Sequence, residues 1–244
     1  MKKQVLSLSV NHGPYATFLQ RIIDLAQHKS SSYVCVANVH MCMEAHWDID
    51  FANQVNSADL VTPDGMPIAK AMKWFHGVKQ DRVAGMDLLP DVLKQAEALK
   101  LGIFFYGGTE DMLSVTKQYV LTNYPGIHQH FYYSPPFRAL TFKEELAIAD
   151  KINESGAHLV FVALGCPKQE RWMAGMKGQI NACMIGIGAA LPVMVGLQTR
   201  APKWMQKLSL EWFYRLCQEP KRLFKRYCVS NISFVYLVVK KKLF

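Results

Sequence analysis

Short apolar runs alternate with longer amphipathic segments along the first 190 residues of the chain. The runs are rich in β-branched and aromatic residues, as in Tyr33 to Val39, and predict buried strands. Between them, apolar residues recur at helical spacing over about ten or more residues. Predicted strands cover 4–10, 33–39, 59–62, 101–106, 128–133, 157–164 and 182–187; predicted helices cover 15–27, 41–55, 68–75, 86–100, 111–124, 142–155 and 167–176. This alternation predicts an α/β fold with a mostly parallel sheet flanked by helices on both faces.

A stiff turn joins the third predicted strand to the helix that follows it. Pro63 and Pro67 fix φ and restrict the residues before them, and Gly65 permits backbone shapes that other residues avoid. We therefore expect Asp64 at the tip of a strand-to-helix turn, at the sheet edge where α/β proteins bind ligands. Two interpretations remain open from the residues alone: Asp64 is the N-cap of the helix, or it has a catalytic or ligand-binding role.

Other polar or glycine-containing loops follow the other predicted strands. They contain Asn38, Arg82, Gly107 and Gly108, 165–170, and 186–190. Glycine lets backbone N–H groups approach a ligand closely, and helix N-termini favour phosphate. Each loop alone is an ordinary turn, but the combination favours a substrate that carries pyrophosphate.

The charge of the chain divides it into two parts. Its 244 residues carry a net charge of +9, and half of them are hydrophobic. Residues 200–244 hold eleven Lys or Arg and two acids, whereas residues 1–199 hold 17 of each sign. We therefore predict a catalytic domain over 1–199 and a basic, aromatic, amphipathic helical appendage over 200–244.

The appendage combines aromatic and basic residues at helical spacing, which suits an anionic membrane surface. Alternatively, its apolar stripe packs on the core of the same chain or on another subunit of a homo-oligomer. Nucleic acid is not an expected partner, since no recognition motif accompanies the charge.

The start of the chain lacks a signal-peptide pattern, and no uncharged apolar run reaches the ~18–20 residues of a spanning helix. Six cysteines without a C-x-x-C pair indicate reduced thiols, so we expect a cytoplasmic protein.

Several familiar motifs are absent or incomplete. The sequence has no P-loop and no G-x-S-x-G, and Leu191 replaces the third glycine after Gly186 and Gly188. Asp48 and Asp50 form a D-x-D pair of the kind that holds a metal ion on some nucleotide-sugars. The pair falls inside a predicted helix, where residues two apart do not share a face. His40, Cys42 and His46 match no zinc spacing, so we expect no metal site and no cofactor.

Several stretches together resemble the WecG/TagA/CpsF family of bacterial glycosyltransferases (glycosyltransferase family 26). They are 58–65 (ADLVTPDG), 82–88 (RVAGMDL), 105–108 (FYGG), 164–170 (LGCPKQE), 200–202 (RAP), 210–216 (LEWFYRL) and 219–223 (EPKRL). The resemblance implies a Rossmann-like fold distinct from the common glycosyltransferase folds. It also implies an inverting, metal-independent transfer of a sugar from a UDP-sugar to a polyprenyl-pyrophosphate-linked saccharide, in cell-surface polysaccharide or teichoic-acid biosynthesis. The sugar is then of N-acetylmannosamine, mannosaminuronate or hexose type, and the enzyme is peripherally attached to the inner face of the cell membrane.

The same resemblance implies a role for individual residues. Asp64 corresponds to the catalytic base, which takes the proton of the acceptor hydroxyl. The implied substrate-binding residues are Asn38, Arg82 and Gln169, with Arg215, Arg222 and Arg226 as basic positions that meet phosphate. The strand-end loops add Gly107, Gly108, Glu170, Gly186 and Gly188 as expected substrate-binding positions. Without a metal ion, arginine side chains and backbone N–H groups must stabilise the charge on the leaving UDP.

Two positions depart from the family pattern. Val36 stands where many members carry a polar residue, and Leu191-Pro192 replaces a Phe-Asp pair. The second departure suggests a changed donor or acceptor specificity. The sugars, the linkage and the oligomeric state stay open from the sequence. A non-catalytic module of the same fold that binds a nucleotide or a lipid is the alternative function.

Overall fold

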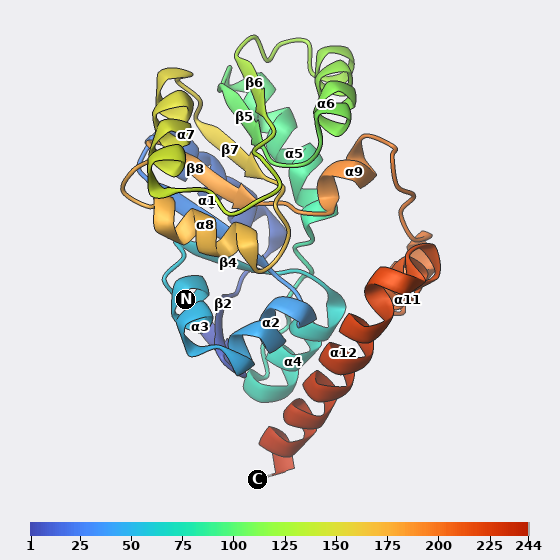
Figure 1. The fold of residues 1–244 in the computed structure, drawn as a ribbon. Helices are drawn as coiled ribbons and strands as arrows, with labels where there is room; N and C mark the ends of the chain where they lie inside the picture. The colour runs from blue at the N-terminus through green and yellow to red at the C-terminus, as the bar shows by residue number, and fades with distance from the viewer. Residues whose placement is uncertain (244) are drawn as a thin grey trace.

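Six parallel strands form the central sheet, in the order β4-β3-β8-β7-β5-β6 (Figure 1). We describe residues 1–243 from a computed structural model, except the side chain of Lys207. The strands are β3 (Ser32–Ala37), β4 (Leu60–Pro63), β5 (Ile103–Tyr106), β6 (His130–Tyr133), β7 (Leu159–Val162) and β8 (Cys183–Gly186). Parallel pairing throughout this sheet confirms the predicted α/β, Rossmann-like architecture.

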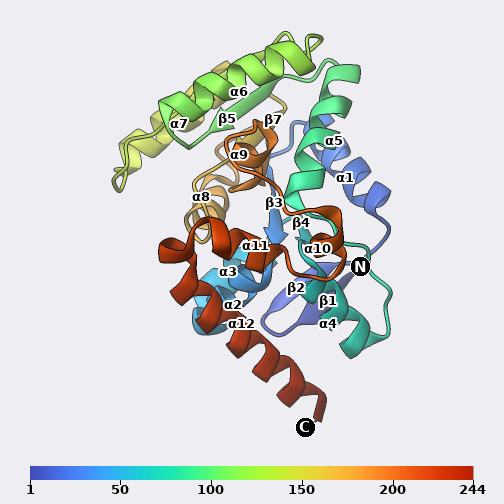
Figure 2. The same ribbon diagram turned by 90° about the vertical axis from the view of Figure 1, so that its right-hand side faces the viewer.

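Helices cover both faces of the sheet, as predicted. One face carries α1 (Tyr15–Gln27), α5 (Gly85–Ala98) and α6 (Glu110–Asn123); the other carries α3 (Ile49–Asn56), α7 (Phe142–Glu154) and α8 (Lys168–Met176). Figure 2 shows α1 and α5 on the side of the sheet opposite α8. Successive residues of β3 alternate between two core clusters, with Val34 in one and Tyr33 and Cys35 in the other. Because β3 is buried on both faces of the sheet, its sequence is a nearly continuous run of apolar residues.

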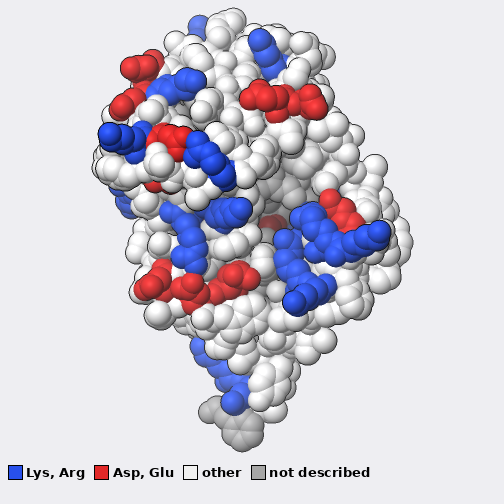
Figure 3. All heavy atoms as spheres, viewed as in Figure 1, with Lys and Arg blue, Asp and Glu red and all other residues white. Residues whose placement is uncertain are grey.

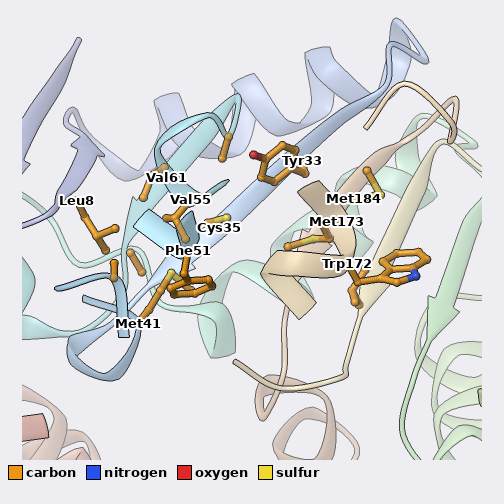
Figure 4. Packing of buried hydrophobic residues seen from close by; sticks show 14 of the residues in the cluster. Leu8, Tyr33, Cys35, Met41, Phe51, Val55, Val61, Trp172, Met173 and Met184 are labelled. Atoms are coloured by element: carbon orange, nitrogen blue, oxygen red, sulfur yellow. The ribbon is translucent and has the colours of Figure 1, made fainter. Parts of the chain in front are cut away.

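Figure 4 shows the core cluster on the α8 side of the sheet. Tyr33 and Cys35 lie between Phe51 of α3 and the α8 pair Trp172 and Met173. All five side chains are buried. This packing fixes α3 and α8 against β3, and so fixes the loops that begin at the ends of β3 and β7.

The predicted first strand, 4–10, is wrong in one respect. It is an antiparallel hairpin of β1 (Lys2–Val5) and β2 (Leu8–Asn11), separate from the main sheet. Val5, Leu8 and Val10 are all buried, and the spacing of three between the first two cannot place both on one face of a straight strand. The chain therefore turns at Leu6, whose φ is 52°.

The predicted helix 41–55 is divided at Asp48. α2 (Val39–Trp47) ends there and α3 begins, because Asp48 adopts an extended conformation and its side chain accepts a hydrogen bond from the N–H of Phe51 at 3.0 Å. Aspartate is a favoured N-cap. The remaining helices before the appendage are α4 (Met66–His76) and α9 (Ala190–Met194).

The C-terminal appendage is helical, as predicted. It consists of α10 (Lys203–Lys207), α11 (Glu211–Gln218) and α12 (Pro220–Leu243). Phe234 and Val238 of α12 join the core cluster that includes α2 and α4, so one face of the helix packs on its own chain. Among the described helices, none has a stretch both long and apolar enough to cross a membrane.

Candidate active site

The ends of β3 and β4 bring Asn38 and Asp64 together. The two strands pair in parallel with Ala37 opposite Pro63, so the next residue of each strand lies at the same edge of the sheet. The backbone N–H of Asp64 donates to the carbonyl of Ala37 at 2.8 Å. The Asn38 side chain caps α2 by accepting from the N–H of Met41 at 3.1 Å, and it also hydrogen-bonds the Asp64 carboxylate. Asn38 therefore helps to orient Asp64.

Asp64 is not the cap of its own helix, so that interpretation of the turn is wrong. The N-cap of α4 is Gly65, with φ at 91°, and α4 receives no side-chain capping bond. Pro67 stands in the first turn of α4, where its missing N–H costs nothing. The Asp64 carboxylate is therefore free to face the sheet edge, where part of its surface remains exposed.

The surroundings of Asp64 raise its pKa to about 7. The main cause is burial, which disfavours the charged form, and the negative charge of Glu211 adds to it. Arg82 and Arg215 act in the opposite direction, as does the hydrogen bond from Asn38. A carboxylate with a pKa near 7 is about half ionised at pH 7, and its ionised form is basic enough to accept a proton.

Arg82 lies beside Asp64 with three hydrogen-bond acceptors around it. Its Nη1 donates to Glu211 at 2.6 Å, and its Nη2 donates to Asp87 at 3.0 Å and to Gln206 at 3.1 Å. Its side chain is only 14% exposed. Arg200 binds the other oxygen of Asp87 at 2.7 Å. Burial opposes the ionisation of Asp87, but its bonds with Arg200 and Arg82 hold its pKa below the usual value.

Four residues of this cluster were missing from the sequence-based prediction: Asp87, Arg200, Gln206 and Glu211. Two of them had a usable signal. Glu211 is one of only two acids in the basic appendage, and an acid in such surroundings is typical of a specific ion pair. Asp87 follows Arg82 in the same short stretch. Gln206 had no comparable signal, because its contact joins segments 124 residues apart.

Gln169 and Glu170 form a second cluster between the ends of β7 and β8. The Gln169 oxygen accepts from the N–H of Gly165 at 3.1 Å, and its nitrogen donates to Glu170 at 2.7 Å. Both residues are buried, and burial raises the pKa of Glu170 to about 6. A Cβ on Gly186 would approach the Gln169 nitrogen to 2.8 Å, so Gly186 leaves room for this amide. The backbone of Gly188, with φ at 44°, lies against the same side chain.

Gly107 and Gly108 lie farther along the sheet, at the end of β5. Three strands separate β5 from β4, which corresponds to roughly 19 Å at the usual strand spacing. Gly107 has φ at 104°, and a Cβ there would approach the backbone of Ala163 to 2.8 Å. A Cβ on Gly108 would collide with Met112. Both glycines therefore permit close packing at this end of the sheet.

Arg222 and Arg226 lie at the start of α12, where it faces α2. Together with Lys225 they line a groove of about 360 Å³, which also includes His40 and Glu44. Burial and the charge of Arg226 lower the pKa of His40 to about 4, so this histidine is neutral at pH 7. Figure 3 shows a hollow between the core and the C-terminal helices, with basic side chains gathered on both sides of it.

The candidate metal ligands have other roles. Asp48 caps α3 and forms an ion pair with Arg171 at 2.7 Å. His40, Cys42 and His46 lie on α2, and Cys42 is buried in the core. Within residues 1–243, no group of three His, Cys, Asp or Glu side chains is arranged to hold a metal ion.

Comparison with known proteins identifies the family. The model of the Glycosyl transferase WecG/TagA/CpsF family matches residues 3–244. An N-acetylglucosaminyldiphosphoundecaprenol N-acetyl-beta-D-mannosaminyltransferase from Bacillus spizizenii is 33% identical over 217 residues, which is 88% of this chain and 81% of the relative. Relatives of the same name from Bacillus subtilis and Staphylococcus aureus are 28% and 27% identical, covering 87% and 88% of this chain and 82% and 83% of theirs. The chain therefore belongs to the WecG/TagA/CpsF family of glycosyltransferases, as the resemblance in its sequence indicated.

Proposed function

We propose that this protein transfers a sugar from a UDP-sugar to a polyprenyl-pyrophosphate-linked saccharide, during assembly of a cell-surface polysaccharide or teichoic acid. The names of three relatives support the acceptor class, since those proteins act on N-acetylglucosaminyldiphosphoundecaprenol. The observation that carries the proposal is the position of Asp64. It combines a partly exposed carboxylate, a pKa of about 7 and two neighbouring arginines at the ligand-binding edge of the sheet.

In this proposal, Asp64 is the general base of an inverting transfer. It takes the proton from the acceptor hydroxyl while that oxygen bonds to the anomeric carbon and the bond from this carbon to UDP breaks. Asn38 orients the carboxylate through its hydrogen bond. The prolines on both sides of this short turn stiffen it and keep the base in place, which matters because proton transfer requires hydrogen-bond distance.

The negative charge that develops on UDP needs stabilising groups. Arg82 and Arg215 lie close enough to Asp64 for their charges to lower its pKa, and Arg222 and Arg226 lie along the groove beside α2. We propose that these side chains, with Gln169 and the backbone around Gly186 and Gly188, bind the donor without a metal ion. Turnover that is insensitive to a chelator is the expected result. Strong dependence on Mg²⁺ or Mn²⁺ would contradict it.

Substitution of Asp64 by Asn separates the transferase from a non-catalytic binding module. Asp64→Asn removes the base but keeps the size and the hydrogen bonds of the side chain. We expect sugar transfer to fall by about 10²–10⁴-fold, while UDP affinity in a calorimetric titration stays close to that of the wild type. Full activity of the variant would refute the role of Asp64. Binding of UDP without any transfer in the wild type would favour the binding module.

The donor sugar is best sought by a screen. The relatives transfer N-acetylmannosamine by name, and we propose the same class or a related hexose here. Val36 is 6% exposed and lies against Gly85, and Leu191 is fully buried, whereas Pro192, at the position of the family's Asp, is only partly buried. A panel of UDP-sugars assayed with a lipid-pyrophosphate-linked N-acetylglucosamine acceptor identifies the donor.

We also propose that the protein acts at the inner face of the cell membrane. Several apolar side chains of α12 face away from the core, including Ile232, Val235 and Tyr236 at 69%, 60% and 62% exposure. Lys240, Lys241 and Lys242 follow on the same helix. Exposed apolar residues beside lysines suit an anionic lipid surface, and each lysine contributes about 1 kcal/mol near such a surface.

A further inference from the structure

Arg82 cannot make a bidentate contact with phosphate in the arrangement described above. A guanidinium grips phosphate with two neighbouring N–H groups, either one from each Nη or Nε with Nη2. Nη2 of Arg82 already donates to both Asp87 and Gln206, and Nη1 donates to Glu211. Both forks therefore lack a free Nη2 donor. A phosphate can bind in fork geometry only if Asp87 or Gln206 leaves Nη2.

Arg200, in contrast, has donors without acceptors. Its Nη1 binds Asp87, but its Nε and Nη2 are buried and have no hydrogen-bond partner among the described residues. Glu211 Oε1 lies 3.7 Å from Nε and is itself buried without a hydrogen bond to any side chain that the structure describes. Unpaired buried polar atoms cost free energy, and several in one place indicate a site that is completed by a ligand.

Two of the three acceptors on Arg82 come from the appendage. Gln206 belongs to α10 and Glu211 to the first turn of α11, whereas Asp87 belongs to α5 in the catalytic domain. Withdrawal of the α10–α11 segment would free one N–H on each Nη of Arg82 at once. It would also uncover the unpaired donors of Arg200.

We propose that Arg82 and Arg200 form one phosphate-binding site, in which the Glu211 carboxylate substitutes for a substrate phosphate until the substrate binds. The ligand is a pyrophosphate group, carried by the nucleotide donor or by the lipid acceptor. This proposal rests on the proposed function and adds Arg200 as a binding residue and Glu211 as a competing anion. Glu211 is suited to this role because its carboxylate presents two oxygens to two arginines, as a phosphate does.

The proposal makes opposite predictions for the two residues in calorimetric titrations of the full chain. With inorganic pyrophosphate as the probe, Glu211→Gln is expected to bind about tenfold more tightly, since the competing charge-assisted bond is weakened. Arg200→Lys is expected to bind about tenfold more weakly, because lysine lacks the fork. Glu154→Gln, an exposed substitution on α7, is the matched control and should leave affinity unchanged.

Two further probes distinguish the source of the pyrophosphate. If the donor fills the site, the change in affinity appears with UDP; if the acceptor fills it, the change appears with a short-chain prenyl pyrophosphate. Equal or weaker binding of all three probes by Glu211→Gln overturns the inference while the proposed function stands. Failure of the wild type to bind any of the probes overturns both.

A second measurement needs no variant. Hydrogen exchange of the wild type with saturating pyrophosphate is expected to rise in α11 relative to α8, because the ligand displaces Glu211 from Arg82. Unchanged or slower exchange in α11 would overturn the displacement of Glu211.

Discussion

The ionised form of Asp64 is costly to the folded protein. Its pKa of about 7 lies above that of an ordinary aspartate, which is about 4. Between these two pH values, the folded state holds a proton on this carboxyl group that the unfolded state has released. The contribution of this group to stability is therefore greatest below about pH 4 and is lost as the pH rises through 7. A catalytic base that is held partly buried thus weakens the fold at the pH where it works.

Asp64→Asn should stabilise the protein at high pH. We expect its free energy of unfolding to exceed that of the wild type by about 1–2 kcal/mol at pH 8.5, because solvent reaching the carboxylate reduces the full effect of the shift. At pH 5.5 the difference should be smaller. Denaturant unfolding at the two pH values measures it, with the exposed Asp150→Asn as the control. A difference that does not change with pH would contradict the raised pKa.

The pH dependence of turnover reports on the same carboxylate. Because the base must be ionised, kcat/KM is expected to rise with pH and to level off above about pH 7. Besides burial, the groups that shift the pKa of Asp64 are Glu211, Arg82, Arg215 and Asn38. Of these only Glu211 raises the pKa, so Glu211→Gln should move the acid limb to lower pH. If the acid limb does not move in this variant, Glu211 does not affect the pKa of Asp64.

At the scale of single elements, the glycines at strand ends have different tasks. Gly107 has a positive φ and faces the backbone of Ala163, so Gly107→Ala is expected to destabilise the protein by at least ~2 kcal/mol. Gly156→Ala is the control, because its φ is 68° and nothing lies within 4 Å of the added Cβ. Unfolding measurements should show a larger loss for Gly107. A raised KM for the donor with unchanged stability would instead indicate direct contact with substrate.

Most elements were predictable because their apolar pattern agrees with their burial. The helix 15–27 has apolar residues at helical spacing, and the strand 33–39 is a short, β-branched apolar run that is buried on both faces. The hairpin at the N-terminus was not predictable from this pattern. Its two strands are so short that the change in the spacing of apolar residues at Leu6 is not evident in the sequence. The break at Asp48 was hidden for a related reason: apolar residues continue at helical spacing on both sides of the cap.

The site was predictable only where it depends on neighbouring strands. Asn38 and Asp64 each follow a parallel strand, and the carboxyl ends of parallel strands share one edge of the sheet. The contact between Arg82 and Glu211 spans 129 residues and depends on how the appendage docks. The charge count that located the appendage gives its composition but not its orientation. Side-chain packing of Phe234 and Val238 on the core decides that orientation.

Because α12 packs on the core, only its exposed face is available to contact a membrane. Its buried stripe holds the appendage on the core, and its exposed stripe is left for lipid. Truncation at Arg200 would remove both stripes and the Glu211 contact together. A cleaner change is the triple substitution of Ile232, Val235 and Tyr236 by Gln, which alters no charge and none of the side chains that pack on the core.

The triple variant should lose most of its binding to anionic vesicles, because it removes buried apolar area at the interface while the lysines remain. Co-sedimentation with phosphatidylglycerol vesicles measures the loss. The matched control is Val115→Gln with Leu121→Gln on α6, two exposed apolar residues remote from the appendage, which should bind as the wild type does. Turnover with a short-chain, water-soluble acceptor should persist in the triple variant, since the cluster around Asp64 and Arg82 is untouched. Vesicle binding equal to that of the wild type would show that this face of α12 does not contact lipid.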